Sequence, residues 1–137
     1  MSLTCLARRA SFQCMHRYAV AAWPEQKNQT TFGACFTPHG HGHNYEIEAY
    51  FSGPVDPVTG MIVNLADVDR WLKTTLESVS GKHLNWEVAE FKDQVPTTEA
   101  LAGYLLRTLQ QITKPTGVSL RKIRLYESED LWVDLWP

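Results

Sequence analysis

Two helical patterns lie next to each other in the middle of this 137-residue chain, and alternating segments flank them on both sides. The first helical pattern begins at Asn64, a suitable N-cap, and ends at Ser80-Gly81. The second opens at Pro96 and is stopped by Pro115. An order of strand-strand-helix-helix-strand-strand is typical of an α+β protein. We therefore expect a four-stranded antiparallel sheet with both helices packed on one face.

Four segments alternate between apolar and polar residues in the manner of β-strands. These segments are Leu3 to His16, Asn44 to Ser52, Val118 to Tyr126 and Leu131 to Trp136. The alternation of the third slips between Leu120 and Ile123, which predicts a β-bulge. From Arg17 to Pro38 the composition is typical of a loop, and a loop of this length in a small domain is usually functional or disordered.

Length and composition favour one ordinary globular domain that covers residues 1–137. The net charge of −2 and the lack of a basic run argue against nucleic-acid binding. No apolar stretch approaches the roughly 20 residues that a membrane span needs. The three cysteines cannot all pair within one chain, so we expect a reduced, cytoplasmic setting.

Histidine and glycine alternate just before the second predicted strand, where His39, His41 and His43 would project to one side. Neutral imidazole is the commonest zinc ligand, so the run is a candidate metal site; the alternative is a polar loop with solvated histidines. Strand positions two apart lie roughly 7 Å from each other, so His41 and His43 can share an ion, whereas His39 and His43 would be about 13 Å apart. A third ligand must therefore come from His16 or His83.

His16 ends the first predicted strand, and pairing of the first two strands would bring it to His41 and His43. Three histidines with an open position are the catalytic form of a zinc site, although His16 alone could be an ordinary core or surface histidine. Imidazoles also suit iron, nickel and copper. Cys35 lies six residues before His41 and, beside a metal, could act as a thiolate base; its alternative is a small buried hydrophobe.

Five motifs are spread over most of the chain. They are Phe12-x-x-x-His16, Cys35-x5-His41-Gly42-His43-Asn44-Tyr45, the segment from Asp56 to Leu65, Thr97-Thr98-Glu99 and Tyr126-Glu127. Together they resemble the 6-pyruvoyltetrahydropterin synthase family. The same superfamily includes 6-carboxytetrahydropterin synthase, an enzyme of queuosine-precursor synthesis. The five-residue gap between Cys35 and His41 resembles the pyruvoyl branch more closely.

This resemblance implies a T-fold, which is a four-stranded sheet with two helices. It implies subunits that assemble through their sheets into barrels, commonly as homohexamers with active sites between subunits. The implied substrate is 7,8-dihydroneopterin triphosphate. By the same resemblance His16, His41 and His43 would bind zinc, and Cys35 would be the catalytic thiolate.

The resemblance also implies a pterin pocket. Glu127 would hold the guanidine-like edge of the pterin, and Thr97, Thr98 and Glu99 would line the same pocket. A buried carboxylate suits two adjacent N–H donors. Simpler roles stay open as well, because Thr97 is a plausible helix cap and Glu127 could be an exposed charge at a strand end.

One segment departs from the family pattern. The family carries an Asp-His pair just after the first helix, where this chain has Ser80 and Gly81. His83 could replace that proton relay if the loop is rebuilt, or Gly81 could simply end the helix. Three functions therefore stay open: a pterin-forming lyase with an altered relay, side-chain cleavage of the carboxy type, and a non-catalytic pterin or zinc-binding protein.

Overall fold

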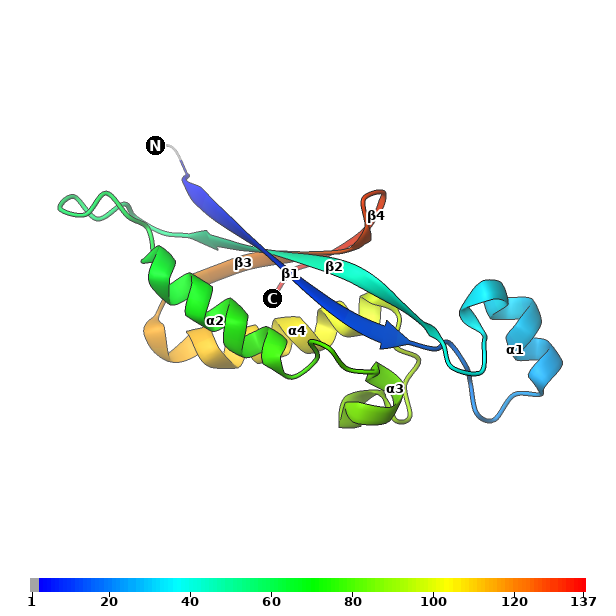
Figure 1. The fold of residues 1–137 in the computed structure, drawn as a ribbon. Coiled ribbons are helices and arrows are strands. Elements are labelled where there is room, and N and C mark those ends of the chain that lie inside the picture. The colour runs from blue at the N-terminus through cyan, green and yellow to red at the C-terminus, as the bar shows by residue number, and fades with distance from the viewer. Residues whose placement is uncertain (1–2) are drawn as a thin grey trace.

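The computed structural model describes residues 3–137, and within them four strands form one antiparallel sheet in the order β1-β2-β3-β4. The strands are β1 (Cys5–His16), β2 (His41–Ser52), β3 (Ser119–Ser128) and β4 (Leu131–Leu135). The two long helices, α2 (Leu65–Glu77) and α4 (Thr98–Thr113), lie on the same face of this sheet (Figure 1). The predicted α+β architecture is confirmed.

Alternate side chains of β2 point into the space between the sheet and the two long helices. The fully buried ones are Tyr45, Ile47, Ala49 and Phe51. Helix residues such as Leu72 and Leu105 belong to the same core. On the opposite face of the sheet, Arg9 forms ion pairs of 2.8 Å with Glu46 and 3.1 Å with Glu48. Because side chains alternate along a strand, His43 and His41, two and four positions before Tyr45, lie on the same face of the sheet.

Side-chain caps begin both long helices where the sequence predicts them. Asn64 Oδ1 accepts a 3.0 Å hydrogen bond from the Ala66 amide, and Thr97 Oγ1 accepts one of 3.1 Å from the Ala100 amide. The predicted bulge in β3 is also present, because the register with β2 shifts between Tyr50 and Phe51. No helix within the described residues is long and apolar enough to cross a membrane.

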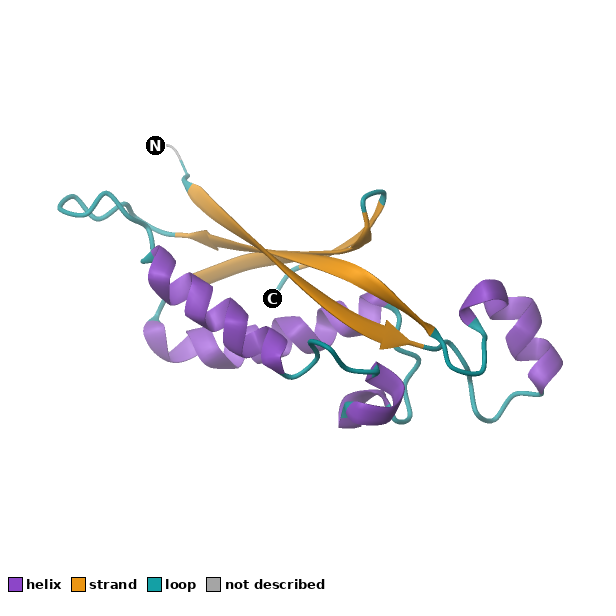
Figure 2. Cartoon of the chain, in the orientation of Figure 1, coloured by secondary structure: helices purple, strands orange, loops and turns teal. Residues whose placement is uncertain are grey.

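The segment expected to be a loop, from Arg17 to Pro38, contains a helix, α1 (Glu25–Phe32), followed by the 3-10 turn η1 (Gly33–Cys35). This helix stands beyond the ends of β1 and β2 (Figure 2). Its sequence has no apolar stripe, and much of its support comes from single contacts instead. Phe32 stacks on Trp23 with ring centroids 5.9 Å apart, and the buried Asn28 side chain bonds both backbone groups of Val20. Helical periodicity therefore could not predict it.

The connection between α2 and α4 holds further short elements that the sequence did not predict. They are the single-turn helix α3 (Leu84–Glu87) and the 3-10 turn η2 (Ala89–Phe91). Outside this connection, a further 3-10 turn, η3 (Lys114–Thr116), follows α4. A helix of one turn carries too few residues to show a 3.6-residue period. Leu84 and Phe91 anchor the connection in the core.

Candidate metal centre

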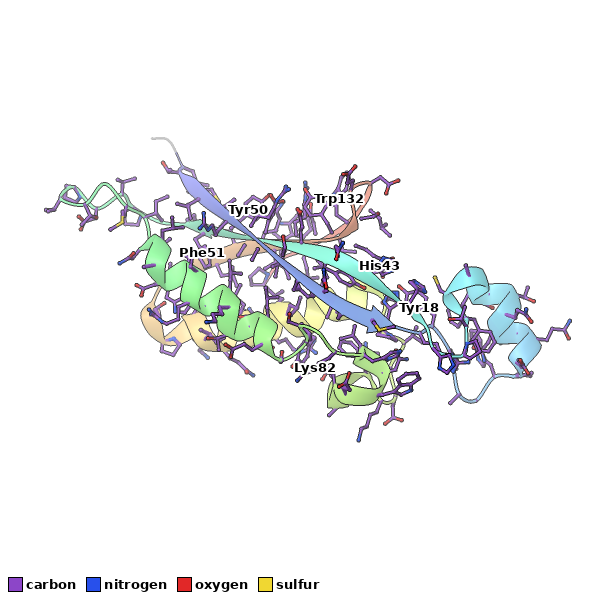
Figure 3. All side chains as sticks on the ribbon, in the orientation of Figure 1. Tyr18, His43, Tyr50, Phe51, Lys82 and Trp132 are labelled. Atoms are coloured by element: carbon purple, nitrogen blue, oxygen red, sulfur yellow. The ribbon has the colours of Figure 1, made fainter. Side chains whose placement is uncertain are left out.

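The register of β1 and β2 brings three histidines together at one end of the sheet. His16 lies directly opposite His41 in the last pair of the ladder, and His43 is opposite Cys14. Cross-strand partners share a face of the sheet, and this is the face that carries the buried Tyr45. His43 lies at the end of the sheet near α1, and Tyr18 lies just beyond the end of β1 (Figure 3). Tertiary pairing thus confirms that His16, and not His39, joins the other two.

The spacing of the imidazole nitrogens suits a single small cation. One ring nitrogen from each of His16, His41 and His43 lies within 4.8 Å of the others. The Nε2 atoms of His16 and His41 are 3.2 Å apart. Two ligands at 2.0–2.1 Å from a tetrahedral zinc ion are separated by about 3.3 Å. His43 Nε2 is buried without a hydrogen-bond partner among the described residues, although Glu127 Oε1 lies 3.2 Å away. The three side chains therefore fit a zinc ion.

The protonation state of His16 also suits a metal ligand. Burial, and then the neighbouring His43 and His41, lower the pKa of His16 to about 3, so its ring is neutral at physiological pH. The Tyr45 hydroxyl lies 3.0 Å from His16 Nδ1. With the ring proton on Nδ1, His16 donates to Tyr45 and leaves the Nε2 lone pair free for a metal. The contact of Tyr45 with a candidate ligand was missed by the sequence reasoning, although the alternation of β2 places Tyr45 on the face of His41.

Two of the four predicted pocket residues, Glu127 and Thr98, lie beside the histidines. Glu127 Oε2 accepts a hydrogen bond from the Thr98 hydroxyl, while its other oxygen faces His43. This carboxylate is only 12% exposed, so it is not a charge at a free strand end. Thr97 is the N-cap of α4, and Glu99 is exposed to solvent.

Cys35 lies in η1 and is partly buried. Its backbone oxygen accepts a 2.9 Å hydrogen bond from the amide of Tyr18, two residues after His16. Burial, and then the charge of Glu127, raise the pKa of its thiol. A cation held by the three histidines would act in the opposite direction, because nearby positive charge favours the thiolate. Cys14, by contrast, is buried in the core, and burial raises its pKa to about 12.

The segment expected to carry the relay pair lies along the outer edge of β1. The Gly81 amide donates a 2.7 Å hydrogen bond to the Gln13 carbonyl oxygen, and Gly81 and His43 line a common cavity of about 320 Å³. His83 is buried nearby, with its Nε2 2.9 Å from the backbone oxygen of His39. His83 therefore contacts the segment that leads into β2.

Gly40 immediately precedes β2 and packs against the backbone of a candidate ligand. Its φ is +75°, and a Cβ atom at this position would lie 2.1 Å from the His16 carbonyl oxygen. We expect Gly40→Ala to destabilise the protein by about 1–3 kcal/mol more than Gly60→Ala. Gly60 has a φ of +71° but nothing within 4 Å, so its substitution costs only the left-handed backbone strain of about 1–2 kcal/mol. Denaturant unfolding of both variants measures the difference, and equal losses would contradict the packing argument.

Comparison with known proteins agrees with this geometry. A sequence model of the family "6-pyruvoyl tetrahydropterin synthase" matches residues 5–137. The 6-pyruvoyl tetrahydrobiopterin synthases of Pongo abelii and Homo sapiens are 38% and 37% identical to this chain over 126 residues, which are 91% of this chain and 86% of each relative. The solved structure of Caenorhabditis elegans 6-pyruvoyl tetrahydropterin synthase is 30% identical and superposes with a TM-score of 0.92. That match covers 100% of this chain and 97% of the other.

The fold and the site together define a T-fold protein with a three-histidine cluster at one end of its sheet. The chain belongs to the 6-pyruvoyl tetrahydropterin synthase family. The cluster of His16, His41 and His43 is consistent with the zinc site of that family.

Proposed function

We propose that this chain is a zinc-dependent lyase that acts on 7,8-dihydroneopterin triphosphate and releases triphosphate to form a 6-pyruvoyl tetrahydropterin. The observation that carries the proposal is the convergence of three imidazoles beside the buried carboxylate of Glu127. That arrangement places a candidate Lewis-acid site next to a candidate acceptor for the pterin. Family membership supports the class of reaction.

In this proposal His16, His41 and His43 hold zinc. The bound ion supplies Lewis-acid polarisation of the hydroxylated side chain of the substrate. Cys35 acts as the base that removes a carbon-bound proton. It lies on η1, and a backbone hydrogen bond from Tyr18 holds it close in space to the residues that follow His16. Its raised pKa would have to fall when the cation binds, so metal loading and formation of the thiolate are linked.

Glu127 is the proposed receptor for the guanidine-like edge of the pterin. Its carboxylate can accept two parallel N–H donors, and the Thr98 hydroxyl bonds one of its oxygens and so fixes its orientation. Thr97 and Glu99 line the pocket from the start of α4 in this proposal. Thr97 contributes mainly by capping the helix that carries Thr98.

The proton relay is the part of the proposal that departs from the family pattern. Ser80 and Gly81 stand at the positions of the expected Asp-His pair, and neither has a side chain that titrates near neutral pH. An acid–base role for His83 stays a prediction. Cys35 acting alone, with water as the partner for the second proton, is compatible with the same residues.

We also propose that the chain acts as one T-fold domain and assembles into a barrel-forming homohexamer with active sites between subunits. The supporting feature is the open sheet, whose edge strands β1 and β4 each have one side without a neighbouring strand among the described residues. Unpaired strand edges are ready templates for strands of another chain. A cytoplasmic location stays a prediction from the unpaired cysteines.

The decisive experiment is incubation of the zinc-loaded protein with 7,8-dihydroneopterin triphosphate, followed by mass analysis of the products. We expect triphosphate and a pyruvoyl product. Release of acetaldehyde would instead indicate cleavage of the carboxy type. Binding of the substrate without turnover would show that the protein has lost catalysis. A Glu127→Gln variant is the control for recognition, because it keeps the shape but loses the negative charge that the pterin edge requires.

A further inference from the structure

The metal centre is built on the last rung of the β1–β2 ladder, where strands ordinarily fray. His16 and His41 are the final pair of the ladder, and beyond them the chain after β1 is joined to the segment before β2 by the Tyr18 amide, which donates to the Cys35 carbonyl oxygen over 2.9 Å. Backbone hydrogen bonds at the end of a ladder open more readily than those in its middle. A site that needs its ligand nitrogens about 3.3 Å apart is therefore stabilised by any further element that holds the two strand ends at this pair.

The connection between α2 and α3 lies along the free edge of β1 and supplies part of that support. The Gly81 amide donates to Gln13 O over 2.7 Å, and the Met15 amide donates to Lys82 O over 2.9 Å. Figure 3 shows Lys82 in this connection, below the end of β1. These two backbone hydrogen bonds hold the connection against β1 as far as Met15, the residue before His16.

Asn85 extends the contact one residue beyond the ladder on the β1 side. Its Oδ1 accepts a 2.8 Å hydrogen bond from the Arg17 amide, and its Nδ2 donates one of 2.8 Å to the Arg17 carbonyl oxygen. A single carboxamide therefore satisfies both backbone groups of the residue that follows His16, as a neighbouring strand would.

His83 makes the equivalent contact on the β2 side. Its Nε2–H donates a 2.9 Å hydrogen bond to the carbonyl oxygen of His39, two residues before His41. The ring stacks on Trp86 with centroids 3.7 Å apart, and the His83 residue is only 7% exposed. Its amide is held by the Glu87 carboxylate at 2.6 Å. The imidazole is therefore held by its Nε2–H and by the stacked ring of Trp86 while it contacts the segment before β2.

We propose that His83 and Asn85 form a clamp that positions the metal centre by holding the two strand ends that carry His16 and His41. They are positioning residues, because the groups that they contact are the backbones of His39 and Arg17. The inference rests on the proposed zinc site, and it assigns His83 a role other than proton transfer. The Nε2–H donates to a backbone carbonyl oxygen, which does not accept a proton in catalysis, and a proton-transfer role would fall to Nδ1, which is buried without a hydrogen-bond partner among the described residues.

The test measures zinc affinity by chelator competition in the absence of substrate, together with the visible spectrum of the cobalt-substituted protein. We expect His83→Ala and Asn85→Ala each to weaken zinc binding by about 10–100-fold, as loss of a group that supports a ligand typically does. The cobalt ligand-field bands should change with them. Thr75→Ala is the matched control, because Thr75 is fully buried and its hydroxyl bonds Trp71 O at 2.8 Å, but it belongs to α2. It should lower stability and leave both metal readouts unchanged.

Conservative variants separate the clamp from an acid–base role and guard against loss of the fold. His83→Gln keeps an N–H donor but cannot titrate near neutral pH, so it should restore zinc affinity and activity relative to His83→Ala. Asn85→Asp keeps only the acceptor for the Arg17 amide and should give a partial loss. Full zinc affinity in His83→Gln with activity as low as in His83→Ala would overturn the statement that His83 has a role other than proton transfer. Unchanged metal binding in both alanine variants would overturn the clamp itself.

Failure of the clamp and failure of the proposed function give different results. If the wild-type protein binds zinc and turns over the substrate while the clamp variants bind zinc normally, only the clamp is wrong. If the clamp variants lose zinc as expected but the wild-type protein shows no turnover, the clamp stands and the lyase assignment fails. Lack of any zinc binding by the wild-type protein would overturn both.

Discussion

His41→Ala is expected to lose more than about 100-fold in zinc affinity, and with it the proposed lyase activity. Loss of an outer-shell group alone costs about 10–100-fold, and this substitution removes a ligand itself. The alanine protein keeps only His16 and His43 as imidazole ligands from the cluster. Two imidazoles do not replace the three protein ligands that catalytic zinc sites use. Metal analysis after dialysis, together with chelator competition, measures the loss.

His39→Ala is the matched control, because it lies in the same histidine–glycine run. The His39 side chain is exposed, and the contact that it makes with His83 uses its backbone oxygen, which alanine keeps. We expect this variant to bind zinc as the wild-type protein does. Full retention of zinc by His41→Ala, or an equal loss in His39→Ala, would show that the ligand assignment is wrong.

Cys35→Ala should lower kcat by about 10²–10⁴-fold while zinc content and the free energy of unfolding stay close to those of the wild-type protein. The reason is that Cys35 is the proposed base and is not part of the histidine cluster. Because the thiolate is the active form, wild-type activity should rise with pH until Cys35 is deprotonated. Burial raises this pKa in the metal-free protein, so zinc loading should shift that rise to lower pH.

Cys5→Ala serves as the control for cysteine replacement, since Cys5 is exposed at the far end of β1. Its rate and pH profile should match those of the wild-type protein. A Cys35→Ala protein that keeps the rising limb of the pH profile would assign that limb to another group, and the proposed role of Cys35 would be withdrawn.

Much of the fold could be predicted because its signals are local. Alternation along residues 44–52 and helical spacing after Asn64 are each carried by neighbouring residues, and the two N-caps depend on contacts two or three residues away. Helix α1 was missed for the opposite reason. Its support includes the Asn28 contact with Val20 and the stacking of Phe32 on Trp23, which leave no periodic pattern.

The candidate site divides in the same way. The sequence by itself determined that His41 and His43 share a face of one strand, because side chains two apart point the same way. Only the tertiary structure decided that His16 lies opposite His41, that Thr98 bonds Glu127, and that His83 and Asn85 hold the strand ends. Those contacts join residues 25 to 68 positions apart in the chain. They depend on strand register and on how α3 and α4 pack, which no local pattern in the sequence encodes.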